Sequence, residues 1–395
     1  MNIWKSKKLK ELDGVEIILG QSPSSKSYNK KKNGLPFLQG KAEFGMIYPI
    51  PEIYTDTPLK IAEGNDLLLS VRAPVGDTNL SPYKLCIGRG LAAIRFKKDN
   101  PKFYFYWFLK NQKHIESLGV GSTFKAITGE QLKKILVPIV ELQEQTAIAN
   151  ILSTVDEAIQ KADEAIIRTE RIKQAMMQKL LSEGIGHKEF KQTKIGRIPK
   201  TWSANYLKTV ASIRNSSTRN NLTKVANIPM ELVSENKMFC DYEVRNRVDI
   251  KSYTYCEKGD LLLAKITPSL ENGKQGIVPE SVPSGVAYAT TEVFPIVTSE
   301  IDTQLLYYIL KAKKFRLKII ASMIGTTGRQ RATKKSIEDL LIPIPLVDEQ
   351  KEIAVILKAI DEKLGLEMER KQRYERIKQG LMDDLLTGKK RIKIN

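Results

Sequence analysis

Side chains that can hydrogen-bond to the bases or phosphates of a nucleic acid gather in a few loop-like stretches of the sequence, many of them beside Gly or Pro. Arg and Lys can donate to guanine, and Asn and Gln can pair with adenine, in the major groove of DNA. The same side chains can instead contact phosphates, which carry no sequence information, or remain solvated surface groups. The candidate DNA-contact residues are Ser22, Ser24, Lys26, Lys30, Lys31, Gln39, Lys41, Arg72, Arg89, Lys125, Arg214, Asn215, Arg219, Lys265, Lys274, Arg329 and Arg331.

Catalytic motifs are weak or missing in the sequence. The stretch GQSPSSKS, residues 20–27, would match a phosphate-binding loop only if Ser25 were Gly, and residues 34–41 have one residue too many between their glycines. No G-x-G-x-x-G opens a helix, and the Asn/Asp-Pro-Pro-aromatic tetrapeptide typical of amino-methyltransferases does not occur. We therefore expect no catalytic centre and no bound cofactor in this chain.

Histidine and cysteine usage argues against a metal site. His114 and His187 have no partners nearby in the sequence, and three cysteines at no metal-like spacing are expected to be small buried residues. The N-terminal residues carry charge without the apolar core of a secretory signal, and no run approaches ~18 apolar residues. These features predict a cytoplasmic protein without a membrane span.

The charge of the chain is strongly positive and unevenly placed. Its 395 residues hold 64 Lys plus Arg and 45 Asp plus Glu, a net charge of +19. Residues 1–142 contribute +9 and residues 187–347 contribute +10, whereas 143–186 and 348–395 contribute only −2 and +2. Because a basic surface attracts polyanions, the two basic segments predict two nucleic-acid-binding lobes.

An internal repeat organises the chain. Residues 136–159, LVPIVELQEQTAIANILSTVDEAI, align without a gap to residues 341–364, LIPIPLVDEQKEIAVILKAIDEKL. From Thr128 to Leu181, about 22 of roughly 54 positions are identical at an offset of 205, far above the three or four expected from composition. Fainter matches lie upstream, such as GNDLLL at residues 64–69 against GDLLL at residues 259–263. Each half is therefore a variable portion followed by a well-matched portion.

The matched portions have the periodicity of long helices. Apolar residues recur at alternating steps of four and three, as in a coiled-coil seam, although an ordinary bundle helix shows a similar stripe. Pro138 and Pro343 precede these segments, and Gly184 and Gly388 lie near their ends, which predicts two helices of ~35–40 residues. The expected helix-packing residues are Ile148, Leu152, Val155, Ile159, Ile353, Leu357, Ile360 and Leu364.

The variable portions are predicted to be mixed α/β structure. Short apolar runs bounded by Gly, Pro and Asn are typical of strands. The expected strands are 67–71, 91–96, 261–266 and 293–297, and the expected helices are 103–110 and 305–315.

Taken together, these motifs make the chain resemble the specificity subunit of type I restriction–modification systems over essentially its whole length. The motifs that carry the resemblance are the block 121–127 with Gly325-Thr326-Thr327, the strand ends at Pro138 and Pro343, and the Glu-Gln pairs 144–145 and 349–350 that open the helices. The resemblance implies an α+β fold with a pseudo-two-fold internal repeat. Two α/β target-recognition domains, 1–142 and 187–347, would be joined by two long antiparallel coiled-coil helices in 143–186 and 348–395.

The resemblance also implies a function and a set of partners. Each recognition domain would read one half of a bipartite site in double-stranded DNA, and the helices would set the spacer and dock two methyltransferase subunits. Those subunits would supply S-adenosylmethionine and adenine methylation, and restriction (motor) subunits would add ATP- and Mg-dependent cleavage. Two alternatives remain open on the residues alone: a self-sufficient DNA enzyme with an unrecognised site, and a coiled-coil scaffold or RNA-binding protein without DNA sequence preference.

Overall fold

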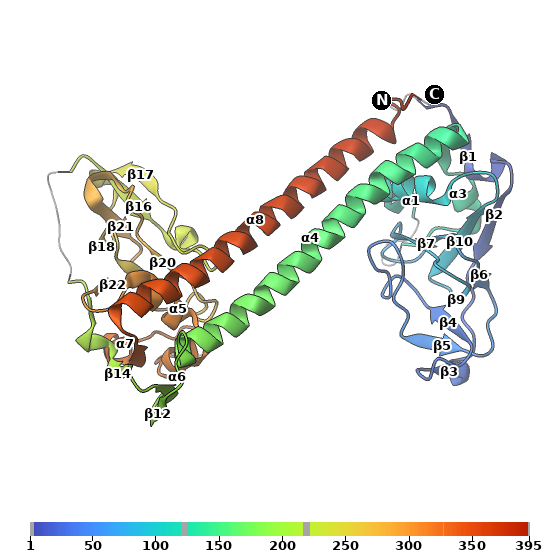
Figure 1. Ribbon diagram of the computed structural model, residues 1–395. Helices are drawn as coiled ribbons and strands as arrows, with labels where there is room; N and C mark the ends of the chain where they lie inside the picture. Colours follow the sequence, from blue (N-terminus) through green and yellow to red (C-terminus); the bar gives the residue numbers. More distant parts are fainter. Residues whose placement is uncertain (1–3, 120–124, 216–221, 327, 394–395) are drawn as a thin grey trace. The chain divides into compact units, whose positions relative to one another are not determined.

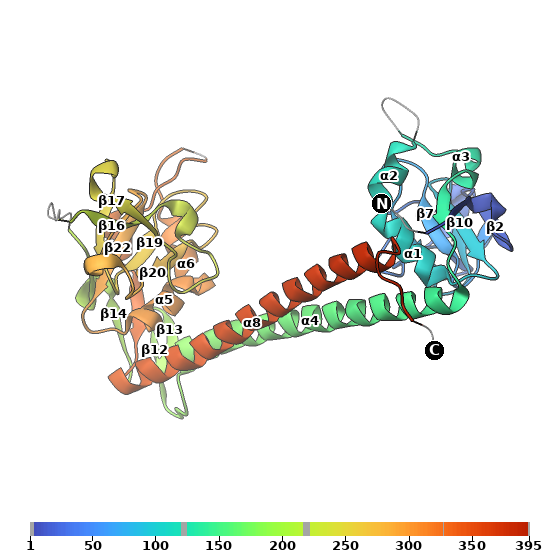
Figure 2. The ribbon, with the colours of Figure 1, turned by 90° about the horizontal axis from the view of Figure 1, so that it is seen from above.

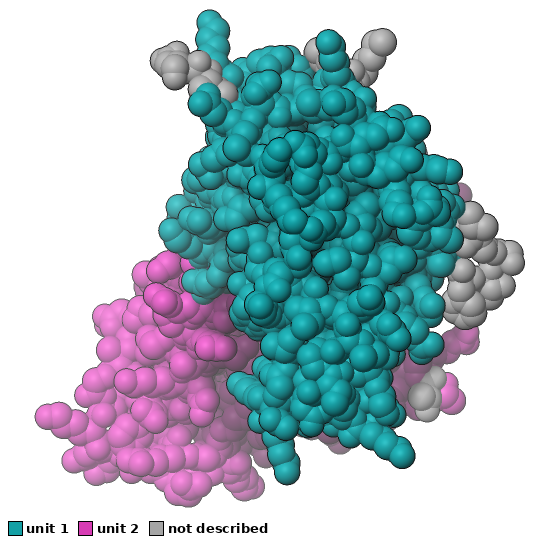
Figure 3. Space-filling view, turned by 90° about the vertical axis from the view of Figure 1, so that its right-hand side faces the viewer, with its two compact units in different colours: residues 1–164, 368–395 teal, residues 165–367 magenta. Residues whose placement is uncertain are grey.

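The computed structural model describes residues 4–119, 125–215, 222–326 and 328–393. The chain divides into two compact units, one made of residues 1–164 and 368–395 and the other of residues 165–367 (Figure 3). Each unit therefore combines one variable portion of the sequence with parts of both long helices.

The first unit is built on two β-sheets and three short helices (Figure 1). A four-stranded sheet has the order β2-β10-β7-β8, a five-stranded sheet has the order β3-β5-β4-β9-β6, and β1 pairs with β11. Its strands are β1 (Ser6–Lys8), β2 (Val15–Leu19), β3 (Tyr28–Asn29), β4 (Leu35–Leu38), β5 (Ile53–Thr55), β6 (Ile61–Ala62), β7 (Leu67–Ser70), β8 (Thr78–Leu80), β9 (Leu85–Ile87), β10 (Leu91–Phe96) and β11 (Leu136–Pro138). Its short helices are α1 (Pro101–Lys110), α2 (Gln112–Ser117) and α3 (Gly129–Lys133).

The second unit has a similar inventory. One four-stranded sheet has the order β15-β22-β19-β20, another has the order β17-β16-β21-β18, and two further strand pairs are β12-β13 and β14-β23. Its strands are β12 (Phe190–Thr193), β13 (Gly196–Pro199), β14 (Ser203–Tyr206), β15 (Ala211–Ile213), β16 (Lys224–Ile228), β17 (Glu243–Asn246), β18 (Thr254–Glu257), β19 (Leu261–Ala264), β20 (Gln275–Ile277), β21 (Val286–Ala289), β22 (Val293–Thr298) and β23 (Leu341–Ile344). Its short helices are α5 (Thr303–Lys311), α6 (Lys313–Ala321) and α7 (Lys334–Glu338).

The central strands of both units are buried on both faces, which explains their unbroken apolar sequences. In β7, Leu67 and Leu69 pack into the core that includes α1, whereas Leu68 packs with Leu38 and Ile87 of the five-stranded sheet. In the second unit, β19 divides its side chains between two cores in the same manner. A strand covered on both sides has no polar face, so its sequence does not alternate. The result is an α+β architecture in which each central sheet is a rigid support for the loops at its edges.

The two long helices are α4 (Leu142–Glu183) and α8 (Val347–Leu385), with 42 and 39 residues (Figure 2). Both are continuous, in agreement with the helices expected from the repeat. Gly184 and Gly388 follow them with φ of +67° and +75°, a conformation that L side chains rarely adopt. A Cβ at Gly184 would also collide with Trp202, and one at Gly388 would collide with Trp4. Glycine at these positions therefore lets the chain turn after each helix and leaves space for a tryptophan ring.

The remaining expected elements are mostly confirmed. Strands β10 and β22 cover the strands predicted at 91–96 and 293–297, and α1 covers the helix expected at 103–110. Strands β7 and β19 match the other two predictions but end earlier, at Ser70 and Ala264. The helix expected at 305–315 is interrupted, because Ala312 has the extended backbone angles φ −63° and ψ 129° and separates α5 from α6. The apolar periodicity continues across this corner, since Phe315 and Ile319 are also buried, and the sequence therefore concealed the break.

Four of the eight predicted helix-packing residues lie in the cores of the two units. Ile148 and Leu152 of α4 pack into the first core together with Met382 and Leu385 from the end of α8. Ile353 and Leu357 of α8 pack into the second core with residues from the end of α4. Ile159 is also buried, while Val155, Ile360 and Leu364 are half-buried. Each core is thus closed by the start of one helix and the end of the other.

Candidate nucleic-acid interface

Three glycines bring separate loops of the first unit into backbone contact. Gly20 follows β2, and Gly88 and Gly90 lie between β9 and β10; we call these three residues the glycine junction. The amide of Gly88 donates to the carbonyl of Leu38 (2.7 Å), and that of Gly90 donates to the carbonyl of Gln39 (3.1 Å). A Cβ at Gly20 would lie 2.1 Å from the carbonyl oxygen of Gly88, and one at Gly88 would lie 2.9 Å from Cα of Gln39. Only glycine permits so close an approach.

The glycine junction places three of the candidate contact residues side by side. The backbone amide of Arg89 donates to Oγ of Ser22 (3.2 Å), and Gln39 is joined to Gly90 by the backbone hydrogen bond. The side chains of Gln39 and Arg89 are exposed, and Ser22 is half-buried. Residues from three different parts of the sequence therefore share one exposed edge.

Two further candidates extend this edge. The amide of Val71 donates to the carbonyl of Gly90 (2.9 Å), and the next residue, Arg72, forms an isolated β-bridge with Ala126. Lys125 precedes that bridge, and the side chains of Arg72 and Lys125 are both exposed. We call Ser22, Gln39, Arg72, Arg89 and Lys125 the first basic edge. No carboxylate lies within ion-pair distance of its three cations among the residues that the structure describes.

The other candidates of the first unit lie outside the first basic edge. Lys41 pairs with Asp77 (2.7 Å), and Ser24 accepts a hydrogen bond from the amide of exposed Lys26. Lys30 and Lys31 are exposed in the turn between β3 and β4, at the opposite end of β4 from Gln39. Four residues of strand separate these ends by roughly 13 Å. The lysine-rich turn is therefore a separate basic patch.

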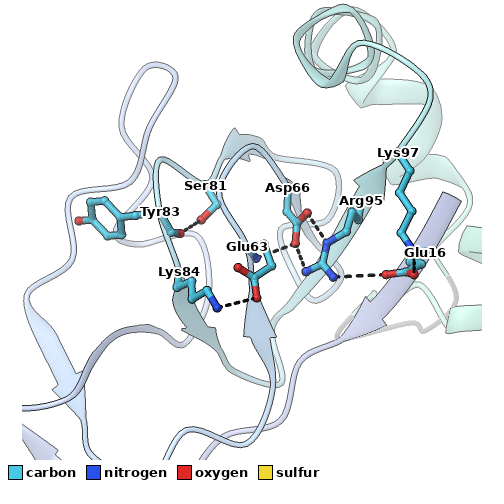
Figure 4. A network of polar contacts seen from close by, with 8 residues as sticks. All are labelled: Glu16, Glu63, Asp66, Ser81, Tyr83, Lys84, Arg95 and Lys97. Carbon is cyan, nitrogen blue, oxygen red and sulfur yellow. Dashed lines mark hydrogen bonds and ion pairs between the residues drawn. The ribbon is translucent and has the colours of Figure 1, made fainter. Parts of the chain in front are cut away.

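A partly buried ion pair joins β10 to the turn before β7, at the end of these strands away from the first basic edge (Figure 4). Nε and Nη2 of Arg95 on β10 donate to the two carboxylate oxygens of Asp66 at 2.9 and 2.8 Å. Asp66 also accepts the amide of Glu63 (2.8 Å), which closes the turn that leads into β7. The Asp66 carboxylate raises the pKa of Arg95, so this paired guanidinium remains charged.

Arg214 has the same structural role in the second unit. Its Nε and Nη2 donate to Asp260 at 2.6 and 2.7 Å, and Asp260 accepts the amide of Glu257 at 2.9 Å. The hydrogen-bonded Asp260 raises the pKa of Arg214. These contacts account for Arg214 within the fold of its own unit, and we leave it out of the interface. Asn215 is exposed beside it, and Arg219 lies outside the described residues.

The remaining candidates of the second unit gather near the end of β19. The amide of Ala332 donates to the carbonyl of Lys265 (2.7 Å), and Ile266 forms an isolated β-bridge with Arg331. Arg331 pairs with Glu292 at 2.8 Å, while Arg329 is exposed two residues earlier. We call Lys265, Arg329 and Arg331 the second basic edge. Partial burial lowers the pKa of Lys265.

The two basic edges use the same backbone contacts with different side chains. In the first unit the amide of Ile127 donates to the carbonyl of Val71 (2.9 Å), and in the second Ala332 donates to Lys265. The loop that follows β7 contains a cis X-Pro bond at Pro74, and the loop that follows β19 contains one at Pro268. Lys274 lies at the far end of the second loop, where its Nζ donates to the carbonyl of Met230 (2.9 Å).

Buried carboxylates at the helix starts were not anticipated as structural residues from the sequence. Glu349 accepts hydrogen bonds from the indole of Trp202 (2.7 Å) and the amide of Ile185 (2.9 Å), and lies 2.9 Å from Nε2 of His187. In the first unit, Glu144 accepts from Arg391 (2.7 and 2.9 Å) and from the amide of Ile392. The repeat aligns the two glutamates, but their partners lie 147 to 248 residues away in sequence, so only a structure could identify them.

A second matched pair of carboxylates lies further along the helices. Asp156 of α4 is 2.6 Å from Nζ of Lys378 and accepts from the hydroxyl of Tyr106 (2.7 Å). Asp361 of α8 is 2.5 Å from Nζ of Lys173 and accepts from the hydroxyl of Tyr308 (3.0 Å). In each unit, therefore, an aspartate of one long helix joins a lysine of the other.

Other kinds of site are not found in the described part of the chain. No group of three or more His, Cys, Asp or Glu residues is placed to hold a metal ion, and no helix among these residues is long and apolar enough to cross a membrane. Cys86, Cys240 and Cys256 are free and buried, as expected. Burial raises the pKa of the Cys240 thiol to about 12, so it is a packing residue rather than a nucleophile.

Comparison with known proteins shows which proteins the chain resembles. A family model described as the type I restriction modification DNA specificity domain matches residues 1–169 and again 188–378. The putative type I restriction enzyme MjaX specificity subunit of Methanocaldococcus jannaschii is 48% identical over 181 residues, which are 45% of this chain and 43% of that protein. The MjaVIII specificity subunit of the same organism is 25% identical over 100% of this chain and 98% of its own length.

A solved structure has the same fold. The S subunit of a type I restriction–modification system from M. genitalium superposes with a TM-score of 0.62 over 100% of this chain and 97% of that one, at 16% identity. Since the family model covers most of the sequence in two copies, the chain belongs to the type I restriction–modification DNA specificity family, whose members are the non-catalytic subunits of their systems.

Proposed function

We propose that this chain reads a bipartite DNA sequence, each unit recognising one half of the target. The observation that carries the proposal is the pair of basic edges. The same backbone contacts present Arg72 and Lys125 in the first unit, and Lys265, Arg329 and Arg331 in the second. A common frame with different base-contacting side chains is what two half-sites of different sequence require.

The two helices then fix the distance between the half-sites as an antiparallel coiled-coil pair with pseudo-two-fold symmetry. The ion pairs of Asp156 with Lys378 and of Asp361 with Lys173 support such a pairing, because each joins the two helices. A helix of 42 residues is about 63 Å long, more than one DNA turn of ~34–36 Å. Two half-sites in successive turns are therefore within its reach.

Partners supply the chemistry in this proposal. Two methyltransferase subunits dock on the helices and bring S-adenosylmethionine, and restriction (motor) subunits bring ATP and Mg. The chain itself contributes DNA specificity in the cytoplasm, where its target lies.

The experiment is to lengthen both helices and read the methylation pattern. Inserting seven residues in each helix, in register with the repeat, adds about 10.5 Å, or roughly three base pairs. With the partner methyltransferase co-expressed, methylome sequencing should show the same half-sites with a longer spacer. Altered half-sites with an unchanged spacer would contradict the proposal. Exchanging residues 1–142 for another family member's first domain should change one half-site only.

Two controls separate the alternatives. Methylation of DNA by the purified chain alone, without methyltransferase subunits, would identify a self-sufficient enzyme. Equal binding to RNA, or to all duplexes in a competition library at physiological salt, would identify a binder without DNA sequence preference.

A further inference from the structure

The second unit contains a basic groove away from its basic edge. A cavity of about 910 Å³ lies between the last part of α4 and the corner where α5 meets α6. Its lining includes five cations, Arg197, Lys311, Lys313, Lys314 and Arg316, and no aspartate or glutamate. We call this the α6 groove. Pockets of 300–1,000 Å³ hold ligands much larger than a single inorganic anion.

The first unit has a related cavity whose lining charges balance. It measures about 390 Å³ and is lined by Lys110 and Lys378 together with Asp156 and Glu375. Both lysines are neutralised, since Lys110 pairs with Asp383 and Lys378 pairs with Asp156. At the repeat offset of 205, Gln178 of α4 stands where α8 has Asp383. The second unit has therefore exchanged a neutral cavity for a basic one.

The cations of the α6 groove lack carboxylate partners within the described residues. Nζ of Lys311 donates to the carbonyls of Gly273 (2.9 Å) and Glu235, and Nζ of Lys314 donates to the carbonyl of Ile195. Lys313 and Arg316 form no ion pair with any described residue. Burial, together with the nearby charges of Lys173 and Arg316, lowers the pKa of Lys311 to about 8. The groove therefore has unbalanced positive charge that a bound anion would offset.

The α6 groove adjoins the loop that leaves the second basic edge. That loop runs from Lys265 to Lys274, and Lys311 holds its penultimate residue, Gly273. Arg316 lies against the same glycine, since a Cβ there would collide with its Nη1. A polyanion that occupies the second basic edge can therefore continue along this loop into the groove.

We infer that the α6 groove binds the phosphate backbone of DNA beside the half-site that the second unit reads. The inference rests on the proposed DNA-reading function and adds a contact that positions the duplex without reading its bases. Long, mobile Lys and Arg side chains without fixed carboxylate partners suit such phosphate contacts.

The test is the salt dependence of DNA binding by the full-length chain. The variant Lys313→Gln/Arg316→Gln removes two groove cations, and Lys318→Gln/Lys251→Gln removes two exposed lysines of the same unit that do not line the groove. Fluorescence anisotropy with a 40-bp mixed-sequence duplex gives log Kd against log salt. Each lost phosphate contact should reduce the slope by about 0.9, which corresponds to roughly 5-fold in affinity at 0.15 M salt.

For the groove variant, the slope of log Kd against log salt should therefore be smaller by about 2 than for the wild-type chain, and the affinity should be about 30-fold lower. The affinity of the control variant should stay within about 3-fold of the wild-type value. Thermal unfolding by circular dichroism checks that both variants fold, and the single exposed change Lys313→Gln should still lose about 1 in slope. A groove variant that binds like its control would overturn the inference. So would normal DNA binding with loss of methyltransferase co-purification, which would make the groove a protein interface. If the wild-type chain does not bind duplex DNA at all, the proposed function fails instead.

Discussion

Replacing Glu349 by Gln should destabilise the second unit strongly. The buried carboxylate accepts from the indole of Trp202, the amide of Ile185 and the ring of His187. Glutamine keeps one oxygen acceptor, but its NH2 group faces donors, so one charged hydrogen bond is lost and one buried donor is left without an acceptor. Losses of this kind total about 3 kcal/mol. For a unit of this size, that lowers Tm by about 6–12 °C.

Scanning calorimetry of the full chain measures this loss directly. The control is Glu352→Gln, one turn further along α8, where the side chain is exposed and forms no ion pair with a described residue. It should shift Tm by less than about 2 °C, as surface substitutions generally do. Equal shifts for the two variants, or a Glu349→Gln shift below 2 °C, would show that the buried carboxylate is not an anchor of the second unit.

The remaining predictions concern the first unit. Gly88→Val forces apart the glycine junction, because a Cβ there meets Cα of Gln39 at 2.9 Å; methylome sequencing should show the first half-site lost or relaxed and the second half-site retained. Arg391 holds the pKa of Glu144 below its ordinary value of 4.5, so their contact stabilises the fold above that pH and is lost as the pH falls through the lower, folded-state pKa. Urea unfolding of Arg391→Gln should show lower stability than the wild-type chain at pH 7, and the difference between the two should shrink as the pH falls below 4.5. A difference independent of pH would refute this reading.

The sequence predicted the repeated features well and the long-range partners poorly. The helices, the central strands and the glycines after the helices follow from periodicity and from turn chemistry, which are local properties. The set of residues that contact one another across the fold is not a local property. Arg95 and Arg214 occur at different positions of the two halves, yet both pair with the aspartate before a central strand. No spacing rule connects them.

The candidate interface shows the same limit. Ser22, Gln39 and Arg89 were selected separately by residue type, and their proximity depends on glycines that permit backbone contact. In the second unit, Arg214 is of a residue type that can contact DNA, but its guanidinium is paired with Asp260. Residue type alone cannot distinguish a guanidinium offered to DNA from one committed to a buried carboxylate, because both require the same hydrogen-bonding group.

The position of the anchors constrains how recognition domains can be exchanged. The first core contains Met382 and Leu385, the indole of Trp4 donates to the carbonyl of Leu385 (3.3 Å), and Glu144 holds Arg391. The first unit is therefore completed by the last residues of the chain, although its variable part ends near residue 142. A transplanted first domain must bring a tryptophan at the position of Trp4, because α8 and its tail present a fixed surface to it. In the proposed function, base-contacting loops can vary where they do not form that surface, as at the edge that carries Arg72 and Arg89.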